Sequence, residues 1–269
     1  MLHTGPRKWI SRKLIWKLRK TFSDPIRSIR LPTGLELLLF PENTFSSDVF
    51  VTGCDLDWGA EALFARFLSR EAALLDIGAH IGYYSLYMLP RVKEVYAFDP
   101  NPDVQNWLRK NLDRFPDAHV VQMAVAASSG KKRFIPTASP DVAHLDTSNN
   151  DPAAIAVDVI TIDEFVSKNS LAITGIKIDV EGFDVDVIAG GRQTLIKQQP
   201  LVLTEAKPGS ALTEALTGTN YSVFALTREN DWSRRTALRR IVGETKQKTK
   251  MLFLVPPRLR GEFQKLEAR

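Results

Sequence analysis

Cysteine and histidine are scarce in this chain of 269 residues, which has one cysteine and four histidines. Because Cys54 has no second cysteine to pair with, an internal disulfide is excluded, and we expect the protein to work in a reducing compartment. No His or Cys residues recur at metal-ligand spacing, so the sequence predicts no metal site. Asp179 and Glu181 could together hold a divalent cation, but no His or Asn cluster completes such a site.

Long apolar runs are also missing. The apolar stretch LELLLF (35–40) is far shorter than the ~20 residues that a membrane-spanning helix needs. Residues 1–22 lack both the apolar segment and the small-residue cleavage site of a signal peptide. We therefore expect a cytoplasmic protein, with at most peripheral contact to the inner membrane surface.

Charge is spread unevenly along the chain, whose formal net charge is +5. Residues 1–30 hold nine Lys/Arg and one acid, and residues 228–269 hold twelve Lys/Arg and five acids. The body between them holds 15 Lys/Arg and 25 acids, a net charge of −10. A nucleic-acid-binding domain would line one continuous groove with positive charge. The acidic body therefore argues against nucleic acid as a partner, although the basic ends suit an anionic or lipid-linked acceptor.

Residues 7–22 have the pattern of a basic amphipathic helix. One face collects apolar residues at helical spacing, namely Ile10, Leu14, Ile15, Leu18 and Phe22. Trp9 and Trp16 fall on the opposite, basic side. Two interpretations remain open. The favoured one packs the apolar face against the body of the protein, and the other places the helix on an anionic membrane surface.

The rest of the chain alternates apolar strands with helical segments, as in an α/β protein with a doubly wound, mostly parallel sheet. The expected strand-forming stretches are a hairpin at 29–40 and single stretches at 48–53, 73–82, 91–102, 119–127, 131–136, 156–166, 175–182, 200–206, 221–226 and 251–256. Residues 137–154, rich in Ser, Asp, Asn and Pro, are expected to form a long loop. We divide the chain into a basic amphipathic extension (1–30), one α/β domain (31–256) and a basic C-terminal tail (257–269).

Four of these strands end in a glycine turn or an acid, at Gly78, Asp99, Asp179 and Glu205. In a doubly wound sheet, ligands bind beyond the carboxyl ends of the strands. We therefore expect these four residues to lie together at a ligand site. The glycine turn should in addition direct backbone N–H groups toward the ligand.

The spacing of the glycines excludes two common nucleotide sites. A dinucleotide fingerprint requires glycines at i, i+2 and i+5, but these positions hold Gly78, His80 and Tyr83. A P-loop requires Gly-Lys-Ser/Thr, but Gly82 is followed by Tyr83 and Tyr84. The turn therefore binds neither a pyrophosphate nor a triphosphate, and an NAD-dependent oxidoreductase is disfavoured.

The pattern that remains is Asp-x-Gly-x-x-x-Gly, from Asp76 to Gly82. Asp99 follows 21 residues after Gly78, and its carboxylate can accept both hydroxyls of a ribose. Asp76, at the root of the turn, can hold an ammonium group, directly or through water. A ribose combined with an amino-acid end, without phosphate, describes S-adenosylmethionine.

Four blocks in this order, LLDIGAHIGYYSL, VYAFDPNP, ITIDEF and IKIDVEGFDVDVIAGG, resemble the FkbM-type branch of the class I S-adenosylmethionine-dependent methyltransferases. The resemblance covers roughly residues 45–256. It implies a seven-stranded, Rossmann-like methyltransferase sheet with helices on both faces. It also implies methyl transfer to a hydroxyl of a sugar, glycolipid or secondary metabolite. The acceptor would then be a small molecule, a glycan or a lipid-linked molecule.

The resemblance also implies roles for individual residues. The cofactor loop would comprise Asp76, Gly78, Ala79, His80, Gly82 and Tyr83. Asp99, with Pro100 and Asn101, would hold the ribose, and Ala124 with Val125 would flank the adenine. Glu61 stands where the family tends to place a glutamate before the first strand. This chain departs from the family's pattern at His80, where Asn is usual, and at Asp184, where Glu is usual.

A hydroxyl acceptor must lose a proton, which a carboxylate or histidine within hydrogen-bond reach can take. The candidates are Asp179, Glu181, Glu205 and His144. Glu181 is preferred as the base, with Asp179 positioning cofactor or acceptor. Two alternatives stay open: a methyltransferase-like module that binds the cofactor without catalysis, and a methyltransferase that acts on nitrogen.

Overall fold

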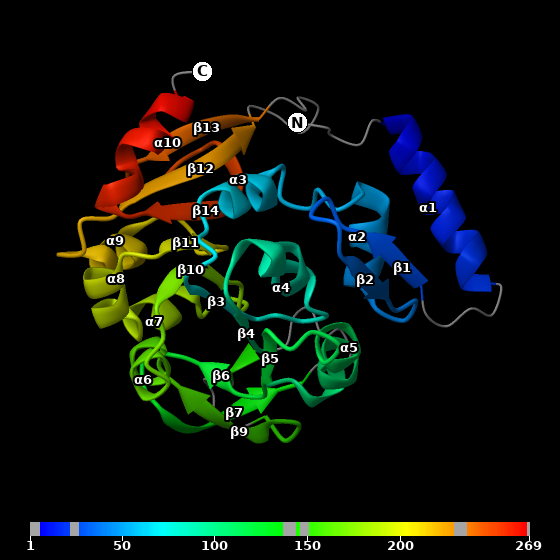
Figure 1. Ribbon diagram of the computed structural model, residues 1–269, viewed down its shortest axis with the longest axis horizontal. Helices are drawn as coiled ribbons and strands as arrows, with labels where there is room; N and C mark the ends of the chain where they lie inside the picture. Colours follow the sequence, from blue (N-terminus) through cyan, green and yellow to red (C-terminus); the bar gives the residue numbers. More distant parts are fainter. Residues whose placement is uncertain (1–5, 22–26, 137–143, 146–150, 229–235, 268–269) are drawn as a thin grey trace.

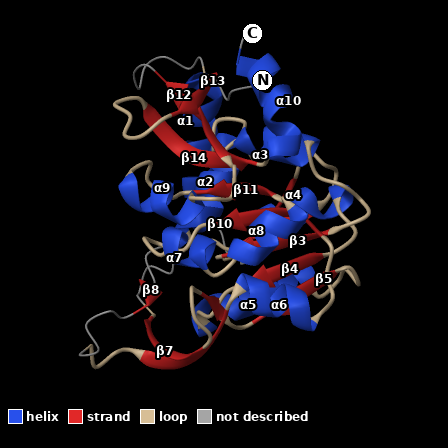
Figure 2. Ribbon diagram, turned by 90° about the vertical axis from the view of Figure 1, so that its left-hand side faces the viewer, coloured by secondary structure: helices blue, strands red, loops and turns tan. Residues whose placement is uncertain are grey.

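The computed structural model describes residues 6–21, 27–136, 144–145, 151–228 and 236–267. Its centre is one sheet of eight strands in the order β13-β12-β14-β11-β10-β3-β4-β5 (Figure 2). The strands are β3 (Ala73–Ile77), β4 (Val95–Phe98), β5 (Ala118–Val121), β10 (Ile173–Ile178), β11 (Leu201–Thr204), β12 (Ser222–Arg228), β13 (Ala237–Ile241) and β14 (Lys248–Val255).

The sheet is mostly parallel, as the sequence predicts. β5, β4, β3, β10 and β11 pair in parallel, whereas β14 runs antiparallel to both β11 and β12. β12 therefore has the direction of the central strands. The sheet has eight strands rather than seven because β13, within a basic segment where no strand was expected, pairs antiparallel with β12 at the edge.

Helices cover both faces of this sheet, which confirms the doubly wound α/β class. On one face lie α3 (Ala60–Arg66), α4 (Tyr83–Met88) with the short 3-10 turn η1 (Leu89–Arg91), α5 (Pro102–Leu112) and α10 (Arg260–Glu267), the last preceded by η3 (Pro257–Leu259). On the other lie α6 (Ile162–Lys168), α7 (Asp184–Ala189), α8 (Arg192–Gln198) and α9 (Ser210–Leu216). Successive strand residues serve opposite cores, because side chains alternate along a strand: Leu74 belongs to the first core and Leu75 to the second.

A second sheet, of order β6-β9-β7-β8, lies beyond β5. Its strands are β6 (Ala124–Val125), β7 (Gly130–Ile135), β8 (His144–Leu145) and β9 (Ile155–Ile160). The single strand expected at 119–127 is thus divided, with β5 in the main sheet and β6 in the second. The expected loop at 137–154 falls largely outside the described residues, which here comprise β8 and 151–154.

The hairpin expected at 29–40 is present, because β1 (Arg27–Arg30) pairs antiparallel with β2 (Glu36–Leu39). The strand expected at 48–53 is wrong, since these residues lie in and at the end of helix α2 (Thr44–Thr52). Asn43 caps this helix by accepting a hydrogen bond from the Ser46 amide at 2.9 Å, and Gly53 ends it in the left-handed conformation. These two caps outweigh the strand preference of the β-branched residues between them.

The expected helix near the start of the chain is present as α1 (Pro6–Thr21), the outermost helix in Figure 1. Its orientation contradicts the favoured interpretation. Trp16 is 6% exposed and packs 5.4 Å from the Phe50 ring of α2, whereas Leu14 and Leu18 are 57% and 60% exposed. The helix packs through its tryptophan side because a large ring fits between Phe50 and the Arg27 guanidinium, which lies 5.5 Å from it. Within the described residues, no helix is both long and apolar enough to cross a membrane.

Candidate active site

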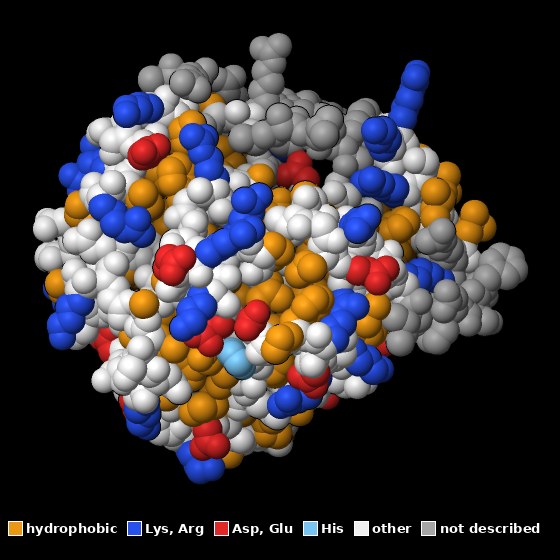
Figure 3. Space-filling view, viewed as in Figure 1, with side chains coloured by type: hydrophobic (Ala, Val, Ile, Leu, Met, Phe, Trp, Pro, Cys, Tyr) orange, Lys and Arg blue, Asp and Glu red, His pale blue; other side chains and the backbone are white. Residues whose placement is uncertain are grey.

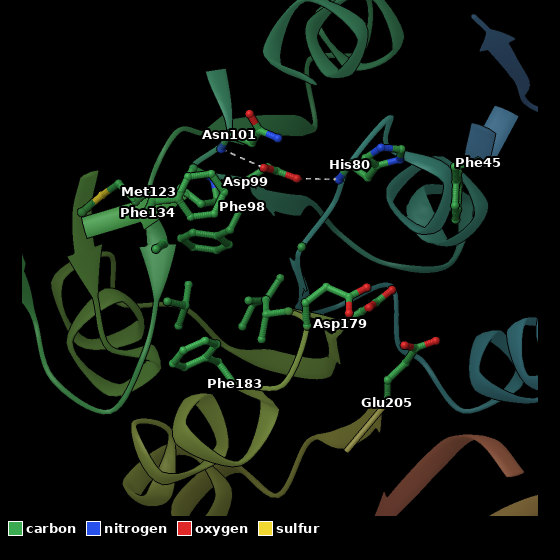
Figure 4. Close-up of a pocket in the computed structure, with 17 residues that line it drawn as sticks. Phe45, His80, Phe98, Asp99, Asn101, Met123, Phe134, Asp179, Phe183 and Glu205 are labelled. Atoms are coloured by element: carbon green, nitrogen blue, oxygen red, sulfur yellow. Dashed lines mark hydrogen bonds between the residues drawn. The ribbon is translucent and has the colours of Figure 1, made fainter. Parts of the chain in front are cut away.

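A cavity of about 230 Å³ opens at the carboxyl ends of β3, β4, β10 and β11 (Figure 4). As predicted, all four residues at these strand ends, Gly78, Asp99, Asp179 and Glu205, line it. The rest of the lining comprises Phe45, Ile77, His80, Phe98, Pro100, Asn101, Met123, Ala124, Val125, Phe134, Val180, Glu181 and Phe183. The predicted ligand site is thus where the parallel sheet brings these strand ends together.

The glycine turn is organised around β4 rather than around a ligand. The amides of Gly78 and Ala79 both donate to the Phe98 carbonyl at 2.9 Å, and the His80 amide donates to Asp99 Oδ2 at 2.9 Å. The expectation that these N–H groups face a ligand is therefore wrong, because each already has a partner. Gly78 has φ +78°, and a Cβ there would lie 1.9 Å from the Asp179 carbonyl oxygen, so only glycine permits this close approach.

Asp99 is the polar centre of one end of the cavity. Its Oδ1 accepts the Asn101 amide and its Oδ2 the His80 amide, both at 2.9 Å (Figure 4). Burial raises the pKa of Asp99 to about 6, although these two hydrogen bonds lower it. Each carboxylate oxygen keeps a further lone pair. Asn101 Nδ2 is buried and has no hydrogen-bond partner in the described part of the chain. It can therefore donate a hydrogen bond to a ligand beside the carboxylate.

An apolar slot adjoins Asp99. Phe98, Met123 and Phe134 surround it in Figure 4, and Ala124 and Val125 also line the cavity; that these two flank the adenine stays a prediction. Sequence reasoning missed the aromatic lining residues Phe45, Phe134 and Phe183, which come from α2, β7 and the turn after β10. No local pattern distinguishes these phenylalanines from core residues.

Lys177, beneath the cavity, joins the glycine turn to the acids. Its Nζ donates to the Gly78 carbonyl at 2.9 Å and lies 3.2 Å from Asp179 Oδ2 and 3.7 Å from Asp76 Oδ1. Burial lowers the pKa of Lys177, but Asp179 and Asp76 outweigh it and hold the pKa above its usual value. Asp76 also accepts a hydrogen bond from Ser85 Oγ at 2.6 Å and is fully buried outside the lining. The ammonium group that Asp76 faces is thus that of Lys177.

Four further residues assigned to the cofactor, Glu61, Ala79, Gly82 and Tyr83, lie outside the lining. Glu61 is buried, and its Oε1 accepts hydrogen bonds from the Tyr83 hydroxyl and the Asp57 amide, both at 3.0 Å. Burial, with the nearby Asp57 carboxylate, raises the pKa of Glu61 to about 8. The structure therefore places Glu61 and Tyr83 in a supporting layer between α3 and α4.

The far end of the cavity carries three acids, Asp179, Glu181 and Glu205. Glu181 adopts φ +41° in the turn after β10 and projects at the exposed rim. Glu205 is also exposed at the mouth, yet protein atoms desolvate its carboxyl group, and this burial, with Asp179 and Asp57, raises its pKa to about 8. Three carboxyl groups so placed can stabilise a positive charge and accept a proton.

Two further residues singled out in the sequence, Asp184 and His144, are not among the described lining residues. Asp184, at which the resemblance implies Glu, accepts a hydrogen bond from Thr204 Oγ1 at 2.8 Å and so fixes the residue before Glu205. His144 lies in β8, paired with Ile135 of β7, and its side chain is outside the described residues.

Known families and proteins match parts of this chain. The family described as the methyltransferase FkbM domain matches residues 76–221. The chain is 30% identical over 131 residues to the hexuronic acid methyltransferase AglP of Haloferax volcanii, covering 46% of this chain and 54% of that protein. It is 26% identical over 147 residues to the 2-O-methyltransferase NoeI of Sinorhizobium fredii, covering 47% and 60%. The matches thus span little more than half the length of these relatives.

Among solved structures, the methyltransferase FkbM from Methylobacillus flagellatus KT aligns with a TM-score of 0.46 and 13% identity. The alignment covers 92% of this chain and 60% of that one.

Proposed function

Because the chain belongs to the FkbM methyltransferase family, we propose that it transfers a methyl group from S-adenosylmethionine to a hydroxyl group of a sugar or sugar-containing acceptor. The observation that carries this proposal is the layout of the cavity. It places a fixed carboxylate, Asp99, between an apolar slot on one side and three acids at the neighbouring strand ends on the other (Figure 4). This layout matches the cofactor, whose ribose joins the adenine to the positively charged sulfonium.

The residues present fit the cofactor. The free lone pairs of Asp99 suit the two ribose hydroxyls. Asn101 Nδ2, which has no hydrogen-bond partner among the described residues, suits an acceptor atom of the nucleoside. Phe98, Met123 and Val125 would hold the adenine by apolar contact. When bound, the cofactor supplies a methyl group activated by its positively charged sulfur. The protein's part is then to orient the acceptor in line with that methyl group and to accept its proton.

We propose Glu205, rather than Glu181, as the group that accepts the proton. A pKa of about 8 makes the ionised Glu205 a stronger base than an ordinary carboxylate, whereas Asp179 is engaged with Lys177. Glu181 lines the same end of the cavity and is the second candidate.

The acceptor is proposed to be a neutral sugar hydroxyl. One relative is named for a hexuronic acid and the other for a 2-O position, which supports a sugar. The described lining contains four acids and neither Lys nor Arg. A carboxylate-bearing acceptor would be repelled by Asp179, Glu181 and Glu205, so a neutral acceptor suits this chain better.

The cofactor assignment is tested by calorimetry with S-adenosylhomocysteine, the demethylated cofactor. We expect saturable binding that weakens at least about tenfold in Asp99→Ala, because one or two hydrogen bonds to a charged group are lost. Asp103→Ala, at an exposed position of α5, is the matched control and should bind as the wild type does. Equal affinity of Asp99→Ala and wild type would contradict the ribose assignment.

Transfer is tested with isotopically labelled S-adenosylmethionine and a panel of methyl glycosides of neutral sugars and of amino sugars, with mass spectrometry of the products. Methylated oxygen is the expected result. Methylation on nitrogen of an amino sugar would instead support the N-methyltransferase alternative. Cofactor binding with no transfer to any acceptor of the panel would favour the module without catalysis.

A further inference from the structure

Helix α1 exposes an apolar stripe, formed by Ile10, Leu14, Ile15 and Leu18. Together with Trp9, these make up five of the eight large hydrophobic side chains that are exposed in the described residues. Leu14 and Leu18 are more than half exposed, one turn apart. Removing such side chains from water is favourable, so a stripe of four left in water points to a surface that covers it.

The stripe faces away from the protein. At 100° per residue, Trp16 lies about 160° around the helix from both Leu14 and Leu18. Because Trp16 is the residue that packs against Phe50, the stripe points outward, and α1 is the outermost helix in Figure 1. Figure 3 shows hydrophobic side chains beside Lys and Arg side chains over this helix.

The charge of α1 identifies what can cover the stripe. Residues 6–21 hold seven Lys/Arg and no acid. Lys8, Lys13 and Lys17 are exposed on both flanks of the stripe. A second copy of the same helix would bring seven more positive charges to this face, so self-association through it is disfavoured. An apolar stripe between basic flanks is the arrangement that lies in the headgroup region of an anionic bilayer.

We propose that α1 binds an anionic lipid surface, lying in its plane with Ile10, Leu14, Ile15 and Leu18 among the acyl chains. The contact with Trp16 stays on the protein side, so α1 binds without leaving the body. This inference goes beyond the proposed function and does not depend on it.

The same helix is connected to the cavity wall. α1 packs on α2, whose first turn carries Phe45, and Phe45 lines the cavity 5.0 Å from the His80 ring. Asn43, the cap of α2, places its Nδ2 3.1 Å from His80 Nε2. One helix layer therefore separates the lipid surface from the cavity, and an acceptor carried by a lipid would be held near the site.

The test is flotation of the full chain with vesicles of phosphatidylcholine alone and with 30% phosphatidylglycerol. We expect binding to the anionic vesicles that weakens in high salt. The double variant Leu14→Glu/Leu18→Glu should lower the partition coefficient at least about tenfold, because it removes two inserted side chains and adds two negative charges. The matched control, Ile196→Glu/Val242→Glu, makes the same change at two exposed positions outside α1 and should bind as the wild type does.

Two results would overturn the proposal. One is equal partitioning of Leu14→Glu/Leu18→Glu and wild type. The other is a wild type that does not bind the vesicles and that forms a dimer, measured by light scattering, which this variant abolishes. The stripe would then be an interface between copies. Binding of S-adenosylhomocysteine by both variants checks that they are folded. A failure of that ligand to bind even the wild type would count against the proposed function and leave the vesicle result unaffected.

Discussion

Glu205 stands at the mouth of the cavity among other acids, and its raised pKa has a consequence for the rate. Desolvation and the carboxylates of Asp179 and Asp57 raise that pKa to about 8. A base must be ionised to accept a proton, and the ionised fraction of Glu205 grows as pH rises toward 8. We therefore predict that kcat/KM for methyl transfer rises about tenfold per pH unit below pH 8 and levels off above it.

Glu205→Gln should remove this pH dependence and lower kcat at least about 100-fold, as is usual when a general base is lost. Glu214→Gln, an exposed glutamate of α9, is the control and should leave both the rate and its pH profile unchanged. If Glu181→Gln abolishes the pH dependence while Glu205→Gln retains it, Glu181 is the base.

In the glycine turn, the backbone of one residue positions the side chain of another. The His80 amide and the Asn101 amide fix both oxygens of Asp99, so the backbone of the turn orients the carboxylate that would hold the ribose. Because this contact uses the amide, histidine in place of the family's usual asparagine at position 80 leaves it intact. The substitution instead puts an imidazole ring against Phe45.

Among the elements, α5 is tied to the hairpin β1-β2 and to the glycine turn by one buried side chain, Asn111. Its Nδ2 donates to the carbonyls of Leu38 and Ile81 at 3.2 and 2.8 Å, and its Oδ1 accepts the Leu38 amide at 2.8 Å. Asn111→Ala leaves these backbone groups without partners. We predict a loss of about 3 kcal/mol in the free energy of unfolding, measured by urea denaturation.

Asn106→Ala is the matched control, because Asn106 lies on the exposed side of the same helix. It should change the free energy of unfolding by less than about 0.5 kcal/mol. Alanine is the better helix former, so helix propensity lowers the stability of neither variant. Similar losses in both variants would therefore contradict the role given to the Asn111 hydrogen bonds.

The elements that the sequence predicts well are those with a strong local signal. The strands β3, β4, β10 and β11 are short, mostly apolar runs, and α5 begins after the capping residue Asn101, which is followed by Pro102. Residues 48–53 were assigned to a strand because of their β-branched residues, whereas tertiary packing and caps make them helical. β13 was missed because, of its residues, Leu238 and Ile241 alone are buried and no alternating apolar pattern results.

The site also has features that the sequence predicts and features that it does not. Strand-end acids are predictable, because parallel strands bring their carboxyl ends to one edge. Which of these acids face the cavity cannot be predicted, since this depends on hydrogen-bond and ion-pair partners far apart in the chain. Asp76 turns to Lys177 and Ser85, and Glu61 to Tyr83, so both lie outside the lining.

At the scale of the whole molecule, both ends of the described chain belong to its cores. Trp16 of α1 and Phe263 of α10 lie in the same buried cluster as Leu74 of β3, and the Phe263 ring lies 5.0 Å from Phe67. The strands of the main sheet contribute alternately to the clusters on its two faces, as Phe253 and Leu254 of β14 do. We therefore expect the segments on either side of the proposed boundaries at residues 30 and 256 to unfold together.

We predict a single calorimetric unfolding transition. At 100 times its Kd, S-adenosylhomocysteine should stabilise the folded chain by about 2.7 kcal/mol and raise the Tm of that transition by roughly 5–10 °C. Asp99→Ala at the same ligand concentration should show a smaller shift, because its affinity is lower. A second transition that the ligand leaves unmoved would mean that α1 or α10 unfolds independently of the sheet that forms the cavity.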